Sequence, residues 1–376
     1  MKILMVSMPS LHFFRWTSQL QGSGHEVYWF DITGMSTPVE RIHWVKQKTA
    51  WKLRWNYPGR IFVKSKIPKI YHWIQSINER NTAKVFEEYL NEIKPDVVHS
   101  FALHISCKPI VEVMKRYKKV KWIYSSWGSD LYARRENING KKVIEQVLPL
   151  IDYLFTDCNR DYEIAKQHGF QGSFLGVFPG GGGYDVKMFK LNAIPFENRK
   201  IILVKGYQGK HGKCIEVLNI LALIKKDLLN YQVVVFGADN EVVTHIKEEL
   251  FLYDGLDILI KERINHQEVL ALMGAAKFYI GYSESDGIPN TLLEAIVAGC
   301  IPLQSNPGGA TAEVITDKFN GILLELDQMK NQILEALHTI DFSKGLKFNE
   351  EVLTPKLTFD FIKTKVCIAY KEIIKV

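Results

Sequence analysis

Cysteine is scarce in this sequence, and none is spaced for a metal site. The 376 residues include five cysteines, no two of which form a Cys-x-x-Cys pair. An odd, unpaired set argues against a disulfide framework or a structural zinc site and predicts a reducing, cytoplasmic compartment. No run approaches ~20 consecutive apolar residues, so we expect no transmembrane helix. The apolar run within the N-terminal MKILMVSMPS is too short to predict a signal peptide.

Tryptophan is absent after Trp127, and positive charge is concentrated in the same first half. Residues 1–190 carry 28 Lys and Arg against 17 Asp and Glu, whereas residues 191–376 carry 20 against 24. The two halves are therefore expected to bind different partners. At roughly 100–200 residues per domain, this length predicts two domains, each able to bury its own core.

Acidic residues are missing altogether from residues 41–78. This segment contains nine Lys or Arg interleaved with Trp44, Trp51, Trp55 and Trp73. Basic side chains are attracted to an anionic leaflet by about 1 kcal/mol each, and tryptophan favours the headgroup region. The pattern predicts a peripheral membrane contact or a site for a lipid-phosphate acceptor. The alternative is a solvated basic face with core tryptophans. Nucleic acid is not expected as a partner, because no nucleic-acid motif accompanies the segment.

Short apolar runs alternate with helix-like stretches such as 82–93 and 214–229. This alternation predicts an α/β fold with parallel sheets and crossover helices. Because the pattern restarts after residue 190, we expect two Rossmann-like domains in tandem. The sequence lacks a Gly-x-Gly-x-x-Gly after the first run, which disfavours a dinucleotide cofactor. The expected strands are 2–7, 26–32, 96–101, 121–126 and 153–158, then 201–206, 231–237, 256–260, 277–283 and 301–305.

The two halves are joined by a glycine-rich link, FPGGGGYDVKMF, at residues 178–189. Consecutive glycines hold φ > 0 at little cost, which favours an interdomain hinge. A backbone cradle for a phosphate is the alternative.

Residues 281–299, GYSESDGIPNTLLEAIVAG, form the segment most suggestive of chemistry. We expect a strand to end near Ser283 and a helix to begin near Asn290, which places the turn at the carboxyl edge of a sheet, where ligands bind. Free backbone N–H groups at this helix N-terminus would suit a diphosphate. Asp286 and Glu294, eight residues apart, could flank one ligand and accept hydrogen bonds from sugar hydroxyls. The alternative is that Asp286 caps the helix and Glu294 is an ordinary helical residue.

This segment resembles the signature of retaining glycosyltransferase family 4, which has the GT-B fold. That signature has two acids with seven residues between them, and the second begins a Glu-Ala pair followed by small residues and Gly. Glu294–Gly299 matches it, whereas the first acid is usually Glu and is Asp286 here. Many members also have His where this chain has Trp127. Other segments similar to the family pattern are 127–131, 157–161, 180–185, 306–309 followed by Glu313, 320–323 and a final helix at 359–374.

The resemblance implies an acceptor domain at 1–190, a nucleotide-sugar donor domain at 191–355 and a crossover helix at 356–376 that returns to the first domain. It implies a retaining, metal-independent enzyme without a cofactor, whose co-substrate is a nucleoside-diphosphate sugar. The absence of Asp-x-Asp between apolar strands of the second half agrees with metal independence. No nucleophile–base pair is evident, which favours front-face attack assisted by the leaving phosphate. With the 41–78 segment, this predicts transfer to a lipid-linked or membrane-proximal glycan in surface polysaccharide assembly, in the cytoplasm or peripherally on the inner face of the cell membrane.

The resemblance also implies a basic pair after the first strand of the second domain, because positioned cations stabilise the charge that grows on the leaving diphosphate. Lys205 and Lys213 fit this role, and Lys210 is the alternative. His99 lies on an apolar run, where a lone His is more often a core residue held by hydrogen bonds than an acceptor contact. The candidate catalytic residues are Asp286, Glu294, Lys205 and Lys213; the candidate donor-binding residues are Gly287, Ile288, Pro289, Asn290, Thr291, Lys210, Gly308 and Gly309; the candidate acceptor-side residues are His12, His99, Trp127 and Asp130.

Two other functions compete with this one. The Asp286 and Trp127 departures would suit a non-catalytic GT-B subunit that binds a sugar or scaffolds a partner enzyme. A sugar-nucleotide epimerase of the same fold would need a different set of acids and histidines.

Overall fold

The structure is a computed structural model that describes residues 1–191 and 193–374. The chain divides into two compact units. The N-terminal unit comprises Met1–Thr156, Asp161–Gly181 and the chain from Cys367, and the C-terminal unit comprises Asp157–Arg160 and Gly182–Val366. The chain passes from one unit to the other within the glycine-rich link, at Gly181–Gly182.

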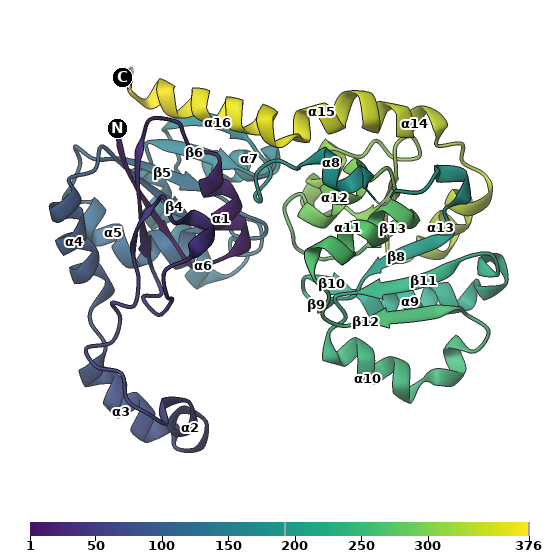
Figure 1. The fold of residues 1–376 in the computed structure, drawn as a ribbon, viewed down its shortest axis with the longest axis horizontal. Coiled ribbons are helices and arrows are strands. Elements are labelled where there is room, and N and C mark those ends of the chain that lie inside the picture. Colours follow the sequence, from purple (N-terminus) through teal and green to yellow (C-terminus); the bar gives the residue numbers. More distant parts are fainter. Residues whose placement is uncertain (192, 375–376) are drawn as a thin grey trace. The chain divides into compact units, whose positions relative to one another are not determined.

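The N-terminal unit is built on a parallel sheet with the strand order β3-β2-β1-β4-β5-β6-β7. Figure 1 labels β4, β5 and β6 of this sheet. Its central strands are almost wholly buried, as expected for a parallel sheet covered on both faces. The strands are β1 (Lys2–Ser7), β2 (Glu26–Asp31), β3 (Lys46–Lys48), β4 (Val97–Phe101), β5 (Lys121–Ser125), β6 (Tyr153–Thr156) and β7 (Ser173–Val177). The helices are α1 (Leu11–Ser18), α2 (Arg60–Lys66), α3 (Pro68–Asn78), α4 (Thr82–Ile93), α5 (Val111–Met114), α6 (Ile138–Val147) and α7 (Asn159–Gln167).

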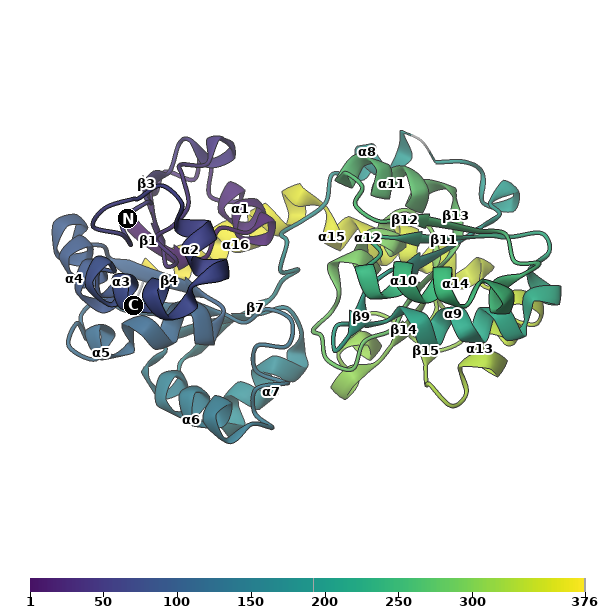
Figure 2. The same ribbon diagram turned by 90° about the horizontal axis from the view of Figure 1, so that it is seen from below.

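The C-terminal unit has a second parallel sheet with the order β12-β11-β8-β13-β14-β15 (Figure 2). Its strands are β8 (Ile201–Lys205), β11 (Gln232–Phe236), β12 (Ile258–Lys261), β13 (Ala276–Gly281), β14 (Ile301–Ser305) and β15 (Ile322–Leu324), and a small hairpin, β9 (Gln208–Gly209) and β10 (Gly212–Lys213), follows β8. The helices are α8 (Val186–Lys190), α9 (Cys214–Leu223), α10 (Asn240–Glu248), α11 (His266–Ala275), α12 (Asn290–Val297), α13 (Met329–His338), α14 (Ser343–Phe348) and α15 (Thr354–Leu357).

Alternate residues of strand β8 enter different cores. Ile202 and Val204 pack with residues of α9, α10 and α13, whereas Leu203 packs with residues of α11 and α12. The sheet is therefore covered by a helical layer on each face. The helix expected over 214–229 ends at Leu223, because Ile224 leaves the helical conformation and a tight turn, Lys225–Leu228, follows.

The prediction of two Rossmann-like domains with a returning C-terminal helix is confirmed. Helix α16 (Phe359–Ile374) begins in the C-terminal unit, and from Cys367 onward it belongs to the N-terminal unit. There the hydroxyl of Tyr370, which is fully buried, hydrogen-bonds to Nδ1 of His99 on β4. Among the described residues, no helix combines the length and the apolar character that crossing a bilayer requires.

Candidate active site

The strand order of the C-terminal sheet creates a binding edge between β8 and β13. After β8 the chain moves outward to β11 and β12, and it then returns to place β13 on the other side of β8. The carboxyl ends of strands at such a switch point form a crevice that suits ligands. β8 ends there at Lys205, and the loop after β13 leads through Asp286 into α12.

Helix α12 presents its N-terminus at this edge. Its N-cap is Pro289, whose side chain has no atom that could accept a hydrogen bond from the first helical N–H groups. Those groups and the helix dipole favour an anion at this position. Thr291 Oγ1 lies 2.8 Å from the hydroxyl of buried Tyr279, which fixes the first turn against β13.

A pocket of about 790 Å³ opens at this edge. Of the candidate residues, it brings together Lys205, Thr291 and Glu294. Its volume lies within the range of small-molecule sites. The remaining lining comes from the end of β11 and from the segments that follow β8, β11 and β12. These residues are Tyr207, Phe236, Gly237, Ala238, Asp239, Asn240, Glu262, Arg263, Ile264, His266 and Val269.

Lys205 is the cation at the end of the central strand. Its Nζ lies 4.8 Å from the centre of the Tyr207 ring. Burial lowers the pKa of Lys205, and the charge of Asp286 opposes that shift. The charge of Asp286 offsets only part of the desolvation of the Lys205 ammonium. An anion bound in the pocket would offset more of it.

Glu294 is buried at 4% exposure and faces His266. Its Oε1 lies 2.8 Å from Nε2 of His266, the first residue of α11. The carboxylate thus reaches the pocket from α12 and the imidazole from α11. Together they offer hydrogen-bond acceptors and donors suited to the hydroxyls of a ribose or a sugar.

Lys213 and Lys210 lie on the β9–β10 hairpin and do not line this pocket. Lys213 Nζ is held 3.1 Å from Glu284 and 3.6 Å from Glu216, and the hydrogen bond to Glu284 raises the pKa of Lys213. Lys210 is exposed, and its carbonyl accepts a hydrogen bond from the Glu284 N–H. Of the candidate lysines, Lys205 is thus the one placed to meet a ligand here.

Arg160 ties together the loops that carry Asp286 and the Pro-Gly-Gly turn. Its Nη1 donates to the carbonyl of Asp286 at 2.8 Å and to that of Pro307 at 2.7 Å. The carboxylate of Glu313 accepts the backbone N–H groups of Asn159 and Arg160 at the start of α7. This network belongs to the C-terminal unit, although Arg160 comes from the first half of the sequence.

Three of the candidate loop positions favour glycine. A Cβ on Gly287 would lie 2.5 Å from both carboxylate oxygens of Asp157. Gly308 and Gly309, in the turn after β14, adopt φ values of 62° and 87°, which strongly favour glycine. Of the other loop residues, Ile288 is buried in the apolar layer beneath α12, and the side-chain oxygen of Asn290 accepts a hydrogen bond from Tyr184.

The four acceptor-side candidates lie in the N-terminal unit, in different environments. His12 is exposed, and its ring lies edge-on 6.3 Å from the half-buried Trp127. Asp130 accepts hydrogen bonds from the Leu103 N–H and the Tyr124 hydroxyl. His99 is fully buried, so the structure places it in the core.

His99 is held there through both ring nitrogens. Its Nε2 lies 2.8 Å from the hydroxyl of Ser125, and Nδ1 bonds to Tyr370. Burial holds the pKa of His99 well below its usual value. The imidazole therefore stays neutral in the fold.

Sequence reasoning did not select the pocket residues Arg263 and His266. Arg160 and Glu313 belong to family-like segments of the sequence but were assigned no role there. A signal for the first two was present. The strand 256–260 is followed by Asn265 and Glu268, which form a capping box at the start of α11. Residues between a strand end and a capping box lie at the ligand-binding edge. The hydrogen bonds of the Arg160 network could not be predicted from local patterns, because the partners are more than 120 residues away in the sequence.

The comparisons with known proteins agree with this arrangement. Residues 2–157 match the family model of glycosyl transferase 4-like proteins, and residues 188–341 match that of glycosyl transferases group 1. No curated protein sequence matches the chain.

Several solved structures share the fold. Sucrose-phosphate synthase from Thermosynechococcus elongatus has a TM-score of 0.71 at 15% identity, with 100% of this chain and 99% of that chain covered. The Anabaena protein HepE, in complex with UDP, has a TM-score of 0.69 at 12% identity, with 99% and 100% covered. The lipopolysaccharide outer core galactosyltransferase WaaB has a TM-score of 0.67 at 14% identity, with 99% of each chain covered.

A glycosyltransferase model thus matches each half of the chain, and the two sheets have the GT-B arrangement. The protein is a glycosyltransferase with the GT-B fold.

Proposed function

We propose that the protein transfers a sugar from a nucleoside-diphosphate sugar to a lipid-linked or membrane-proximal glycan, with retention of anomeric configuration and without a metal ion. The observation that carries the donor assignment is the pocket at the β8–β13 edge, where the half-buried Lys205 lies with Thr291 and Glu294. A desolvated cation beside a helix N-terminus suits a diphosphate. The complex of HepE with UDP makes uridine the first nucleotide to test.

The residues at this edge of the sheet have distinct roles in the proposal. The N-terminal turn of α12, with Gly287 and Thr291, receives the diphosphate, and Lys205 neutralises the charge that grows on it as the glycosidic bond breaks. Glu294 accepts hydrogen bonds from ribose hydroxyls and is oriented by His266. Asp286 accepts hydrogen bonds from the transferred sugar.

The chemical step is front-face substitution. The acceptor hydroxyl oxygen bonds to the anomeric carbon on the side from which the phosphate oxygen departs, and its proton passes to that phosphate oxygen. The products are the glycosylated acceptor and the nucleoside diphosphate. On the acceptor side, the exposed His12 and the Trp127 ring offer a hydrogen-bonding group and a stacking surface for a glycan.

The acceptor class is inferred from the acid-free segment 41–78, which favours a membrane-proximal substrate. Surface polysaccharide assembly on the inner face of the cell membrane fits such an acceptor. The family-4 signature around Asp286 and Glu294 supports retention.

A thermal-shift screen with UDP, GDP, ADP and CMP, each with and without EDTA, tests the donor site. A ligand at 100 times its Kd stabilises the fold by about 2.7 kcal/mol. We expect one nucleoside diphosphate to raise the unfolding temperature equally in EDTA. No shift with any of them would refute the donor assignment. Binding without turnover of the matching sugar nucleotide, with a lipid-linked glycan present, would favour the non-catalytic subunit. The anomeric configuration of the product, read by NMR, tests retention.

A further inference from the structure

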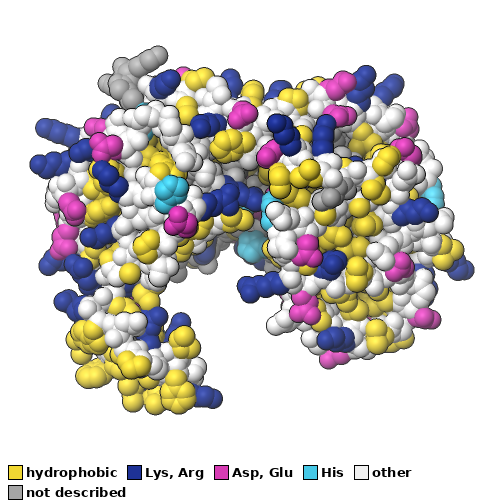
Figure 3. All heavy atoms as spheres, viewed as in Figure 1, with side chains coloured by type: hydrophobic (Ala, Val, Ile, Leu, Met, Phe, Trp, Pro, Cys, Tyr) yellow, Lys and Arg dark blue, Asp and Glu magenta, His cyan; other side chains and the backbone are white. Residues whose placement is uncertain are grey.

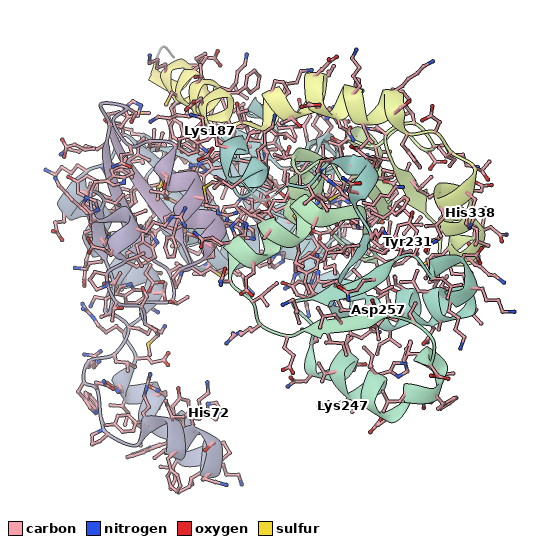
Figure 4. The ribbon with its side chains drawn as sticks, turned by 45° about the vertical axis from the view of Figure 1, so that its right-hand side comes forward. His72, Lys187, Tyr231, Lys247, Asp257 and His338 are labelled. Carbon is pink, nitrogen blue, oxygen red and sulfur yellow. The ribbon has the colours of Figure 1, made fainter. Side chains whose placement is uncertain are left out.

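Helices α2 and α3 form a hairpin that stands out from the sheet of the N-terminal unit (Figures 1 and 4). Its base is a short antiparallel neck. The Arg54 N–H donates to the Asn78 carbonyl at 2.9 Å, and the Arg80 N–H donates to the Lys52 carbonyl at 2.8 Å. The amide of fully buried Asn78 also bonds to both backbone groups of Trp55. The hairpin is thus anchored at one end.

The amphipathic pattern of this hairpin is inverted. Ile70, Trp73 and Ile77 repeat at helical spacing along α3 and are 49%, 66% and 52% exposed. The buried residues of α3 are instead polar, Gln75 and Asn78. In a helix that packs on a core, the apolar stripe faces inward.

Helix α2 continues the exposed apolar surface. Ile61 is 80% exposed and Phe62 is 61% exposed. Figure 3 shows hydrophobic side chains gathered over α2 and α3, with Lys and Arg among them. A contiguous apolar patch of this kind marks an interaction surface.

The charge on the hairpin has one sign. Lys64, Lys66 and Lys69 are exposed, and His72, labelled in Figure 4, lies on α3 beside Trp73. No acidic residue occurs between positions 41 and 78. Cations interleaved with exposed Trp, Phe and Ile fit a bilayer interface, where ammonium groups meet lipid phosphates and apolar side chains enter the acyl boundary.

The first part of the acid-free segment does not share this character. Trp51 is buried, stacks on Phe30 at 4.9 Å and donates its indole N–H to the Asp31 carbonyl. Lys46 pairs with Glu26 at 3.2 Å. Residues around 46–51 therefore serve the fold, and the exposed surface begins at the neck.

We propose that the α2–α3 hairpin docks on a bilayer containing anionic lipid, with Ile61, Phe62, Ile70, Trp73 and Ile77 inserted below the phosphates and the three lysines at their level. A second copy of the hairpin is a poor occupant, because its like charge would repel. The inference deepens the proposed function by placing the enzyme at a membrane acceptor, but the docking itself does not depend on sugar transfer.

Vesicle binding tests the proposal. The full chain is mixed with phosphatidylcholine vesicles in which about a third of the lipid is phosphatidylglycerol, and with pure phosphatidylcholine vesicles, and the bound fraction is measured by flotation. Three variants are compared with the wild type: Phe62→Ser with Trp73→Ser, the triple Lys→Gln change at 64, 66 and 69, and the control Leu229→Ser with Phe251→Ser. The control residues are 79% and 70% exposed in the C-terminal unit.

We expect binding to the anionic vesicles and little to the neutral ones. The triple Lys→Gln variant should lose roughly 100-fold in partitioning, since each basic residue contributes about 1 kcal/mol near an anionic surface. The Phe62/Trp73 variant should lose at least about tenfold, and the control should bind like the wild type. Brominated lipids should quench wild-type fluorescence, and Trp73→Phe should reduce that quenching more than Trp55→Phe, because Trp73 is 66% exposed on α3 whereas Trp55 is 48% exposed at the neck.

Failure of the wild type to bind anionic vesicles would overturn the proposal, as would equal loss in the control. Loss of a concentration-dependent dimer in the hairpin variants, without vesicle binding by the wild type, would assign the surface to self-association instead. The nucleotide-induced thermal shift of each variant is measured in parallel. The thermal shift of each variant should equal that of the wild type. Vesicle binding therefore tests the docking proposal, and the thermal shift tests the donor site independently.

Discussion

Replacement of Lys205 by Met, compared with the same change at Lys213, tests which of the two lysines binds the diphosphate. Lys205 lines the pocket, whereas Lys213 is held by Glu284 and Glu216. Removing one pre-organised group that stabilises developing charge typically lowers kcat by about 10²–10³-fold. We expect a loss of that size for Lys205→Met. For Lys213→Met we expect less than about fivefold, the scale of an exposed ion pair.

The stability of the free protein should move in the opposite direction. Burial lowers the pKa of Lys205, which means that the empty pocket disfavours its charge. An uncharged Met of similar length removes that cost. The unfolding temperature without ligand should therefore stay the same or rise, while the nucleotide-induced increase shrinks. If Lys205 only supported the fold, its replacement by Met would lower the unfolding temperature instead.

The assay pairs calorimetric binding of the nucleotide chosen by the thermal-shift screen with initial rates of nucleotide release from the matching sugar donor. Wild type, Lys205→Met and Lys213→Met are measured side by side. Wild-type affinity and rate in Lys205→Met would refute the reasoning. So would a large loss in Lys213→Met alone, because it would move the diphosphate to the β9–β10 hairpin.

Three further outcomes are expected. Glu294→Gln should weaken nucleotide binding by about 10–100-fold, the range for a hydrogen bond to a charged group, and calorimetry with His266→Ala should show a smaller loss. Arg160→Gln frees the carbonyl of Asp286, so it should raise the donor KM more than it lowers kcat. His99 stays neutral in the fold while the unfolded chain takes up a proton near pH 6.5. Stability of the N-terminal unit should therefore be complete above that pH and fall by about 1.4 kcal/mol per pH unit below it. Urea unfolding followed by tryptophan fluorescence reports this unit, since all eight tryptophans lie between residues 16 and 127, and the slope should flatten in His99→Gln.

The sheets could be predicted because their strands are short, buried and almost wholly apolar, and parallel strands require crossover helices. Strands such as β3, with the sequence Lys-Gln-Lys, had no such signal. That strand pairs in parallel with β2, and the flanking contacts are the Lys46–Glu26 ion pair and the hydrogen bonds from Gln47 to the carbonyls of Val39 and Ile42. These partners are distant in the sequence or polar, so no local apolar pattern predicts the strand.

The candidate site divides in the same way. Lys205 could be predicted because it lies at the end of an apolar strand. Thr291 and Glu294 could be predicted because they follow the start of a helix, and strand ends and helix starts are both set by local sequence patterns. The pairing of Lys213 with Glu284 depends on how the β9–β10 hairpin folds back on the loop after β13, which no local pattern reveals. Likewise, the sequence could not distinguish the buried Trp51 from the exposed Trp73, although both lie in the same acid-free segment.

The two proposals together require the chain to attract anions with two surfaces whose net charges differ in sign. The second half has more acids than bases, so its net field repels a nucleoside diphosphate at long range. Binding there must rest on short-range features. These include the half-buried ammonium of Lys205 and the N-terminus of α12, which salt screens weakly, and the exposed Arg263 at the same pocket. The α2–α3 hairpin instead presents several exposed cations, whose attraction salt screens strongly. Moderate salt should therefore release the protein from anionic vesicles while leaving the donor pocket able to bind its nucleotide. If salt weakened both equally, the pocket would be an exposed electrostatic site and not the desolvated one that the Lys205 environment describes.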